Sequence, residues 1–210
     1  MSTTLPVVFV VDDDPAIRGY LTKLVGSVGL GCEAYSSADE FISHVDREQC
    51  GCAILDVRLP GSSGLDAQQF MVERGIPLPV IFVTGYADVA MTVRAMKAGA
   101  VDVFVKPINS QDLLDSVHRA IEIDLRRLEA NQDLRRLELL QGTLTPRERE
   151  VMALVVTGLP NKHVAEKLGT TLKTIKTHRS RVMRKMRADS LAELVRMADR
   201  LGQPLREVRV

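Results

Sequence analysis

The sequence contains few cysteines, and their positions do not fit a disulfide-rich or zinc-binding protein. The 210 residues include three, Cys32, Cys50 and Cys52. An odd number without regular spacing does not describe a disulfide framework, and Cys50 with Cys52 supplies too few of the four ligands that a structural zinc site usually takes. We therefore expect the three cysteines to be reduced residues of a folded core.

The sequence also lacks a long apolar run and a basic N-terminus. No stretch approaches the ~18 apolar residues of a membrane span, and residues 1–6 have no basic region ahead of an apolar signal core. These absences predict a soluble, cytoplasmic protein with no membrane partner.

The overall charge is nearly balanced, but its distribution along the chain is not. Hydrophobic residues make up 45% and charged residues 26% of the chain, which is ordinary for globular proteins, and the length suits two domains. Residues 1–125 carry 9 basic and 17 acidic residues, a net charge of −8, whereas residues 144–210 carry 15 and 7, a net charge of +8. An acidic half joined to a basic half indicates a regulatory or metal-binding module attached to one that binds a polyanion.

The first half of the chain alternates short apolar runs with amphipathic segments. Runs rich in β-branched residues occur at 7–11, 52–55, 80–83 and 101–105, with a weaker one at 31–35. Continuous apolar strands between amphipathic helices are typical of a parallel sheet covered on both faces. We predict a doubly wound α/β domain with a five-stranded parallel sheet.

Polar side chains follow all of these predicted strands but the second. They are Asp12, Asp13 and Asp14 after the first strand, Asp56 at the end of the third, Thr84 after the fourth and Lys106 after the fifth. Because the carboxyl ends of parallel strands share one rim, we expect these side chains to meet there. Crowded carboxylates repel one another unless a cation joins them, and oxygen ligands without His or Cys indicate Mg²⁺.

The same set of residues suits phosphoryl transfer onto Asp56. With the metal ion bound, positions stay open for phosphate oxygens, Lys106 can neutralise a further oxygen, and Thr84 can donate a hydroxyl hydrogen bond. We predict that the carboxylate of Asp56 is the nucleophile. Asp14 precedes Pro15 and is better explained as the N-cap of a helix than as a metal ligand.

Five ordered motifs within residues 6–124 resemble the receiver domains of two-component response regulators. They are VVDDD at 10–14, LDVRLPG at 55–61, VTG at 83–85, AMKAGA at 95–100 and VKP at 105–107. The resemblance implies that Asp56 is the phosphoacceptor, that Asp12 and Asp13 hold Mg²⁺ with Asp56 and the backbone carbonyl of Arg58, and that Thr84 and Lys106 contact the phosphoryl group. It also implies a cis peptide bond before Pro107, because cis bonds are largely confined to X-Pro.

One position departs from the pattern of that family. Receivers commonly carry Tyr or Phe three residues before the lysine, where ring rotation couples phosphorylation to the output face, and here that residue is Val103. Phe104 is adjacent, but neighbouring side chains of a strand point to opposite faces. We expect any movement of Thr84 to be sensed without an aromatic switch.

Residues 111–141 contain neither glycine nor proline and predict one long helix. Apolar residues recur in steps of three and four as far as Leu128 and resume at Leu134, Leu137 and Leu140. The second stripe suits a short coiled coil between two copies, and it equally suits a contact with the chain's own C-terminal domain. Both alternatives stay open at this point.

The second half of the chain predicts four short helices with clear boundaries. The first begins at a capping box of Thr145 and Glu148, with Pro146 at its first position, and ends at Gly158; the second spans about 161–168 and ends at Gly169. The third begins at the cap Thr171 and reaches about Arg187, and the fourth begins at a capping box of Ser190 and Glu193 and ends at Gly202. Four helices in fewer than 70 residues predict a small all-α bundle.

The third of these helices has a basic face rich in hydroxyl groups. Ile175, Val182 and Met186 form its predicted buried side, and Lys173, Lys176, Thr177, Ser180, Arg181 and Arg184 share the other. A helix of this kind after a tight turn suits the helix-turn-helix, which binds in the DNA major groove. Cations on its flanks would bind phosphate, and residues of its N-terminal half could reach base edges.

Residues 143–200 resemble the DNA-binding domain of the LuxR and NarL type. The matching stretches are LTPREREV at 144–151, GLPNK at 158–162, IKTH at 175–178, Val182 and KM at 185–186. The resemblance implies base contacts from Lys176, Thr177 and Ser180 and backbone contacts from Lys173, Arg179 and Arg184. It makes His178 a packing residue and the helix at 191–201 a dimer contact, although the apolar stripe of that helix could equally be core.

Together these patterns indicate a transcriptional response regulator most like the FixJ and NarL group, and no enzyme. We predict a receiver at 1–124, a helical linker at 125–142 and a helix-turn-helix domain at 143–210. The expected partners are a sensor histidine kinase, a double-stranded DNA operator, RNA polymerase and a second copy of the chain, bound on phosphorylation or on DNA.

Two alternatives compete with this interpretation. A phosphatase of the haloacid dehalogenase type also uses an Asp nucleophile and Mg²⁺, but its motif needs Thr or Val where this chain has Ala16, and no cap domain is present. A DNA-binding protein with a degenerate, phosphorylation-independent receiver is opposed by the complete acidic site and mildly supported by Val103.

Overall fold

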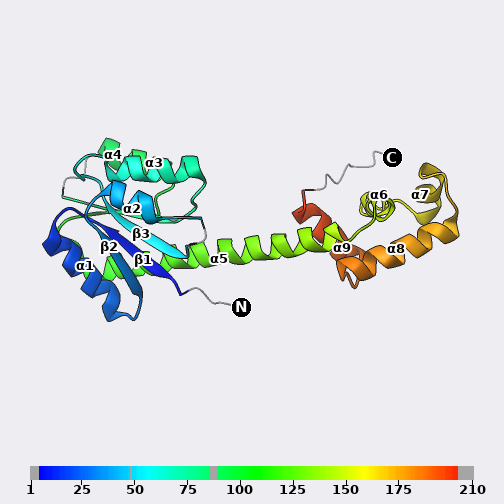
Figure 1. Cartoon of the computed structure of the whole chain (residues 1–210), viewed down its shortest axis with the longest axis horizontal. Coiled ribbons are helices and arrows are strands. Elements are labelled where there is room, and N and C mark those ends of the chain that lie inside the picture. The colour runs from blue at the N-terminus through cyan, green and yellow to red at the C-terminus, as the bar shows by residue number, and fades with distance from the viewer. Residues whose placement is uncertain (1–4, 48, 86–88, 203–210) are drawn as a thin grey trace. The chain divides into compact units, whose positions relative to one another are not determined.

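A computed structural model describes residues 5–47, 49–85 and 89–202 (Figure 1). The chain divides into two compact units, Met1–Leu128 and Glu129–Val210. Each unit has its own core and is described by itself. Among the described residues, no helix combines the length and the apolar character needed to cross a membrane.

The first unit is an α/β fold in which strands and helices alternate. Its elements are β1 (Val7–Val11), α1 (Pro15–Ser27), β2 (Gly31–Tyr35), α2 (Ala38–His44), β3 (Gly51–Asp56), α3 (Gly64–Arg74), β4 (Val80–Thr84), α4 (Val89–Lys97), β5 (Asp102–Val105) and the start of α5 (Ser110–Gly142). The strands are all parallel and lie in the order β2-β1-β3-β4-β5. The predicted doubly wound, five-stranded sheet is confirmed.

Alternate residues of the central strands pack into two apolar layers, one on each face of the sheet. Phe9, Leu55 and Phe82 belong to the layer that includes residues of α2, α3 and α4. Ile54 and Ile81 belong to the layer that includes residues of α1 and α5. Because both faces are covered, strand β3 is buried along its whole length.

Strand β5 confirms the predicted alternation around the position that lacks an aromatic ring. Val103 packs against the first of these layers, whereas Phe104 packs against the second. Phe104 therefore does not substitute for a ring at position 103.

Helix α5 is continuous over 33 residues and extends across the division between the two units. In the first unit its buried residues include Leu113 and Val117. In the second unit Leu137 is buried and Leu140 packs against the apolar cluster of that unit. Of the two alternatives for the second stripe, the structure contains the contact with the chain's own C-terminal domain.

The second unit places four short helices after the end of α5. They are α6 (Pro146–Val155), α7 (Asn161–Lys167), α8 (Leu172–Met186) and α9 (Leu191–Arg200). Val151, Val164, Ile175 and Leu194 meet in one apolar cluster, to which all four helices contribute. The predicted bundle is confirmed.

The caps of these helices follow the sequence with one exception. Thr145 and Glu148 form both bonds of a capping box. Ser190 accepts from the backbone N–H of Glu193, but the Glu193 carboxylate accepts from the N–H of Asp189 at 2.8 Å. The predicted capping box of α9 is therefore only half formed, because the acid bonds one residue further upstream.

Candidate functional sites

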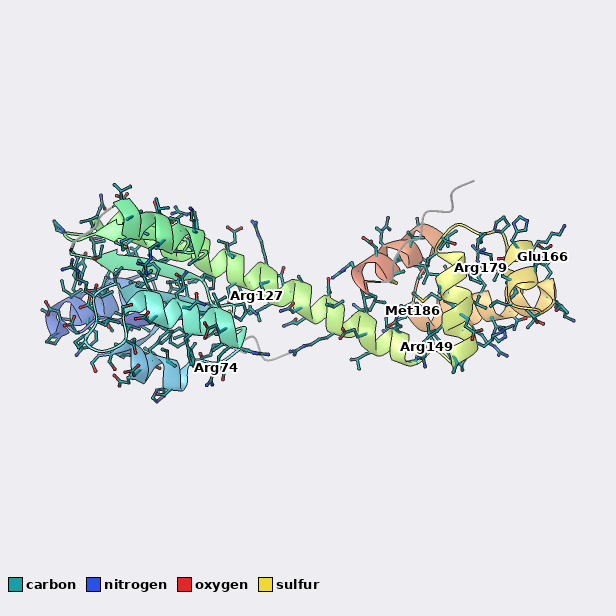
Figure 2. All side chains as sticks on the ribbon, turned by 90° about the horizontal axis from the view of Figure 1, so that it is seen from above. Arg74, Arg127, Arg149, Glu166, Arg179 and Met186 are labelled. Carbon is teal, nitrogen blue, oxygen red and sulfur yellow. The ribbon has the colours of Figure 1, made fainter. Side chains whose placement is uncertain are left out.

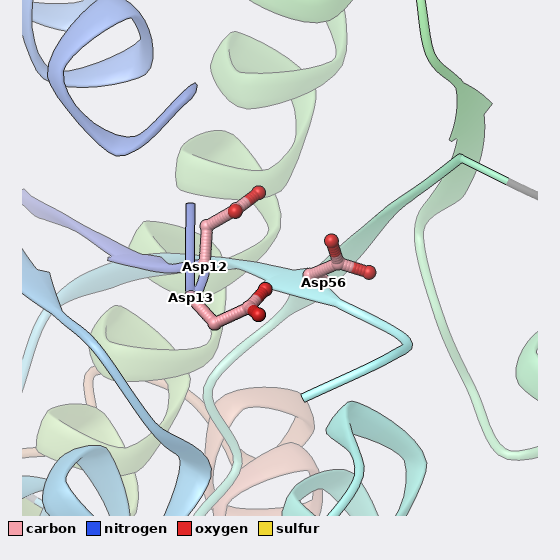
Figure 3. Close-up of side chains that lie close together, drawn as sticks. All are labelled: Asp12, Asp13 and Asp56. Carbon is pink, nitrogen blue, oxygen red and sulfur yellow. The ribbon is translucent and has the colours of Figure 1, made fainter. Parts of the chain in front are cut away.

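Three carboxylates converge at the carboxyl end of the sheet (Figure 3). Asp12 and Asp13 follow β1, and Asp56 is the last residue of the neighbouring strand β3. Each offers an oxygen, and the three oxygens lie within 4.8 Å of one another. The strand order reverses between β1 and β3, which is where open α/β sheets form a crevice. The structure thus brings Asp56 together with two residues that lie 44 and 43 positions before it in the sequence.

Lys106 bridges two of these acids from the far edge of the sheet. Its Nζ donates to Oδ2 of Asp12 at 2.7 Å and to Oδ2 of Asp56 at 2.6 Å. Burial would lower the pKa of Lys106, but the bonds to both carboxylates raise it overall. Burial also raises the pKa of Asp12, and the bonds from Lys106 and from the N–H of Asp14 offset this only in part. These bonds do not fully compensate the burial of Asp12, so the site favours a further cation.

The loops around the acids hold them through backbone bonds. The N–H of Arg58 donates to Oδ1 of Asp56 at 2.8 Å, while the Arg58 side chain is exposed. A Cβ at Gly64 would lie 2.2 Å from the carbonyl oxygen of Asp56, so glycine permits this close return of the chain. The peptide bond between Lys106 and Pro107 is cis, as the resemblance implies.

Thr84 lies at the same rim in a fully buried position. It is the last residue of β4, and its carbonyl oxygen accepts from the N–H of Lys106 at 2.8 Å. The backbone bond sets the lysine beside the threonine. Together with the three acids, they place on one rim the side chains that the sequence predicted there, except Asp14, which caps α1.

Helix α1 contributes two groups to this rim, of which the sequence predicted only one. Oδ1 of Asp14 accepts from the N–H of Ala16 at 2.8 Å, so Asp14 is the predicted N-cap. Arg18 was missed: its Nη1 donates to the carbonyl oxygens of Asp12 at 2.7 Å and Asp13 at 3.3 Å. The one available signal was its place one turn after the cap, which directs a long side chain back over the turn.

The basic face of α8 is open to solvent as predicted. Ile175, Val182 and Met186 are buried, and the exposed positions include Lys173, Lys176, Thr177, Ser180, Arg181 and Arg184. Arg179, labelled in Figure 2, differs because it is half-buried. Its Nη1 donates to Oδ1 of Asn161 at 3.0 Å. The bond joins the middle of α8 to the first residue of α7 and holds Arg179 against α7.

A buried ion pair fixes α8 against α6. Nζ of Lys185 lies 2.6 Å from Oε2 of Glu148, an acid whose side chain is 3% exposed. That bond and the N–H of Thr145 hold the pKa of Glu148 at about 2, below its ordinary value of 4.5. The sequence identified Glu148 as a capping residue and gave no signal for its partner, which lies 37 positions away.

Comparison with known proteins assigns both units to families. A model described as the response regulator receiver domain matches residues 8–118, and one described as bacterial regulatory proteins of the luxR family matches residues 142–198. Nodulation protein W of Bradyrhizobium diazoefficiens is 50% identical over 96% of this chain and 88% of its own length. The chain is a response regulator of the FixJ/NarL family.

Other relatives share both domains of this response regulator. The transcriptional regulatory protein FixJ of Bradyrhizobium diazoefficiens is 36% identical over 95% of this chain and 98% of its own length. The solved structure of the response regulator StyR is 40% identical, covers 93% of this chain and 98% of that chain, and superposes with a TM-score of 0.84. Regulators with these two domains are generally not enzymes, and neither family match supports the phosphatase alternative.

The acidic rim of this response regulator fits the metal that receiver domains generally bind. The three acids supply carboxylate oxygens, which Mg²⁺ prefers over the nitrogen and sulfur ligands of zinc. The raised pKa of Asp12 points the same way, because a divalent cation offsets the burial of its charge. Receiver and LuxR-type domains also imply a histidine kinase partner and DNA binding.

Proposed function

We propose that phosphorylation of Asp56 controls DNA binding by the basic face of α8. The convergence of Asp12, Asp13 and Lys106 on Asp56 is the observation that supports this proposal. A nearly buried carboxylate with a cation on one oxygen is held in one orientation, which positions the other oxygen for attack. In this proposal, phosphorylation of Asp56 is the chemical event that controls transcription.

In the proposed reaction Asp56 attacks a phosphoryl group carried by a histidine of the kinase. A bond forms between a carboxylate oxygen of Asp56 and phosphorus, and the bond between phosphorus and the kinase nitrogen breaks. Mg²⁺, held by Asp12, Asp13, Asp56 and the carbonyl oxygen of Arg58, would neutralise phosphate oxygens. Lys106 leaves its bond with Asp56 to bind a phosphoryl oxygen, and the Thr84 hydroxyl donates to another.

The output is assigned to α8 with contacts of two kinds. Lys176 and Thr177 in the N-terminal half of the helix and Ser180 just after its midpoint are exposed, and we assign base-edge contacts to them. The cations proposed to bind the DNA backbone are Lys173, Arg179 and Arg184. Backbone contacts position the helix, and base contacts select the sequence.

The organisation of the protein follows from this assignment. We propose a receiver at 1–124, a linker at 125–142 and a DNA-binding domain at 143–210, acting in the cytoplasm without catalytic turnover. A second copy of the chain would bind on phosphorylation or on paired operator half-sites, because two-fold protein symmetry matches a palindromic operator. RNA polymerase is the expected final partner.

The experiment compares the natural chain with Asp56→Asn in the presence of Mg²⁺ and acetyl phosphate. Intact mass should show one added phosphoryl group on the natural chain and none on the variant. Affinity for a duplex selected from a random-sequence pool should rise on phosphorylation in the natural chain alone. Asp115→Asn, which removes an exposed acid of α5, is the matched control and should label fully.

Two outcomes would contradict the proposal. If Asp56→Asn still labels and still gains DNA affinity, Asp56 is not the phosphoacceptor. If the natural chain labels but binds the duplex equally with and without the phosphodonor, the receiver is phosphorylation-independent in its output.

A further inference from the structure

A buried carboxylate lies at the opposite end of β3 from Asp56. Asp124 of α5 is 0% exposed. Its Oδ2 accepts from the N–H of Gly51, the first residue of β3, at 2.9 Å. Its Oδ1 accepts from Nε of Arg127 at 2.7 Å. Neither the acidic rim nor the DNA-binding face uses this group, although a buried carboxylate is costly unless its bonds are retained.

The start of β3 has little freedom to move relative to its neighbours. A Cβ at Gly51 would lie 1.8 Å from the carbonyl oxygen of Val7, so the chain there lies directly against β1. The N–H of Val7 also donates to the carbonyl oxygen of Cys50 at 2.9 Å. The first residue of β3 is therefore held between β1 on one side and the carboxylate of α5 on the other.

Strand β3 links this point directly to the acidic rim. All six of its residues are buried, and it pairs with β1 and β4. A strand packed on both faces and both edges transmits a displacement better than it absorbs one, because interiors are close-packed. Phosphorylation of Asp56 must change the bonds that its oxygens make with Lys106 and Arg58, so the strand is disturbed at its carboxyl end.

The other end of this connection is the part of α5 that leads out of the receiver. Arg127 lies on α5 just before the division between the units (Figure 2). Its Nη2 is buried, and within the described ranges it has no hydrogen-bond partner. The guanidinium is thus held by its bond to Asp124, and Nη2 can donate in a second conformation of Arg127.

We propose that Asp124 is a positioning residue that couples phosphorylation of Asp56 to α5 through β3. The coupling rests on the proposed function of Asp56. It provides a path from the site to the connecting helix that needs no aromatic ring at Val103. The bond from Gly51 depends on the position of β3, and the bond from Arg127 couples that position to the turn of α5 that enters the linker.

The test uses full-length chains carrying Asp124→Ala or Asp124→Asn, with Arg119→Gln as the matched control. Arg119 also joins α5 to the sheet, by an ion pair with Asp102 at 2.8 Å, but this pair is exposed and lies on β5. Each chain is labelled with acetyl phosphate and Mg²⁺, and its affinity for the selected duplex is measured with and without label.

The natural chain and the control should gain DNA affinity on labelling by a factor of about five or more. Asp124→Ala should still label Asp56 but lose most of that gain, and Asp124→Asn, which can keep the Gly51 bond, should lose less. A purely structural role would lower stability and leave the gain unchanged, so a folded Asp124→Ala chain with the natural gain overturns the proposal.

A second measurement covers the case in which Asp124→Ala does not fold. In the natural chain, Mg²⁺ with beryllofluoride, a mimic of the acyl phosphate, should shift the Gly51 amide resonance together with those of the acidic rim. A shift at the rim with none at Gly51 overturns the coupling. A natural chain that fails to label overturns the function of Asp56 instead, so the two failures are distinct.

Discussion

Glu148 shows how one residue can serve both a local and a distant contact. Its carboxylate accepts from the N–H of Thr145 at the start of α6 and from Nζ of Lys185 near the end of α8. Because the acid is buried, the charge depends on both partners. The ionisation of Glu148 should therefore contribute to the folding of the DNA-binding unit.

We expect Glu148→Gln to destabilise the second unit by about 2–3 kcal/mol at pH 7. Glutamine still fits a capping box, so the loss isolates the charged pair with Lys185. The pKa of Glu148 is about 2 in the folded chain against an ordinary 4.5. The stabilisation is therefore complete above about pH 4.5 and is lost as the pH falls through about 2.

Urea titrations of the full chain, followed by methyl resonances of Val151 and Val182, measure this effect. The difference between the natural chain and Glu148→Gln should be constant above pH 5 and fall to roughly half or less at pH 3. Glu150→Gln is the control, since Glu150 forms an exposed pair with Arg147. It should change stability by less than about 0.5 kcal/mol. A difference that persists unchanged at pH 3 would contradict the assigned ionisation.

The sequence predicted the residues of the acidic rim well because each one follows a strand. Parallel topology then dictates that Asp12, Asp56 and Lys106 share an edge. Arg18 and the Glu148 pair were not predictable in the same way, because a contact between a side chain and a distant backbone or charge leaves no periodic pattern. Asp124 likewise looks like one more polar residue of an amphipathic helix until the start of β3 is placed against it.

Helix boundaries were predicted from cap residues, and the end of α8 shows where that method weakens. Arg187 ends α8 in the left-handed conformation, with a φ of 57°. Every other residue with positive φ in the described ranges is a glycine. Glycine is the usual residue there, and Arg carries a steric cost. The predicted end of the helix at about Arg187 is confirmed, but the sequence did not predict the left-handed conformation of that residue.

Arg187→Gly should therefore stabilise the second unit by about 0.5–1 kcal/mol, the relief of the left-handed backbone exceeding the greater freedom of glycine in the unfolded chain. Arg196→Gly makes the same substitution inside α9 and should destabilise by about 1 kcal/mol. The same urea titration measures both variants. Equal signs for the two would show that the backbone at position 187 is not strained.

Across the whole chain, the distribution of charge agrees with the proposed functions of the two units. The net charge of −8 over residues 1–125 includes the acids of the proposed phosphorylation site, and that of +8 over residues 144–210 includes the cations of α8. A strongly basic unit binds a polyanion mainly by displacing counterions. DNA affinity of the full chain should then fall steeply with salt, whatever the operator sequence.

The slope of log affinity against log salt concentration separates the two kinds of proposed contact. Lys173→Gln, at a proposed phosphate contact, should reduce the slope by about 1 and weaken all duplexes alike. Lys176→Gln, at a proposed base contact, should cost about 1–3 kcal/mol on the selected duplex and much less on others. Arg200→Gln removes a cation of α9 that is paired with Asp133 of α5, and it should leave slope and specificity unchanged. If Lys176→Gln weakened every duplex equally, α8 would be bound to DNA through its charge alone, and base selection would have to come from other residues.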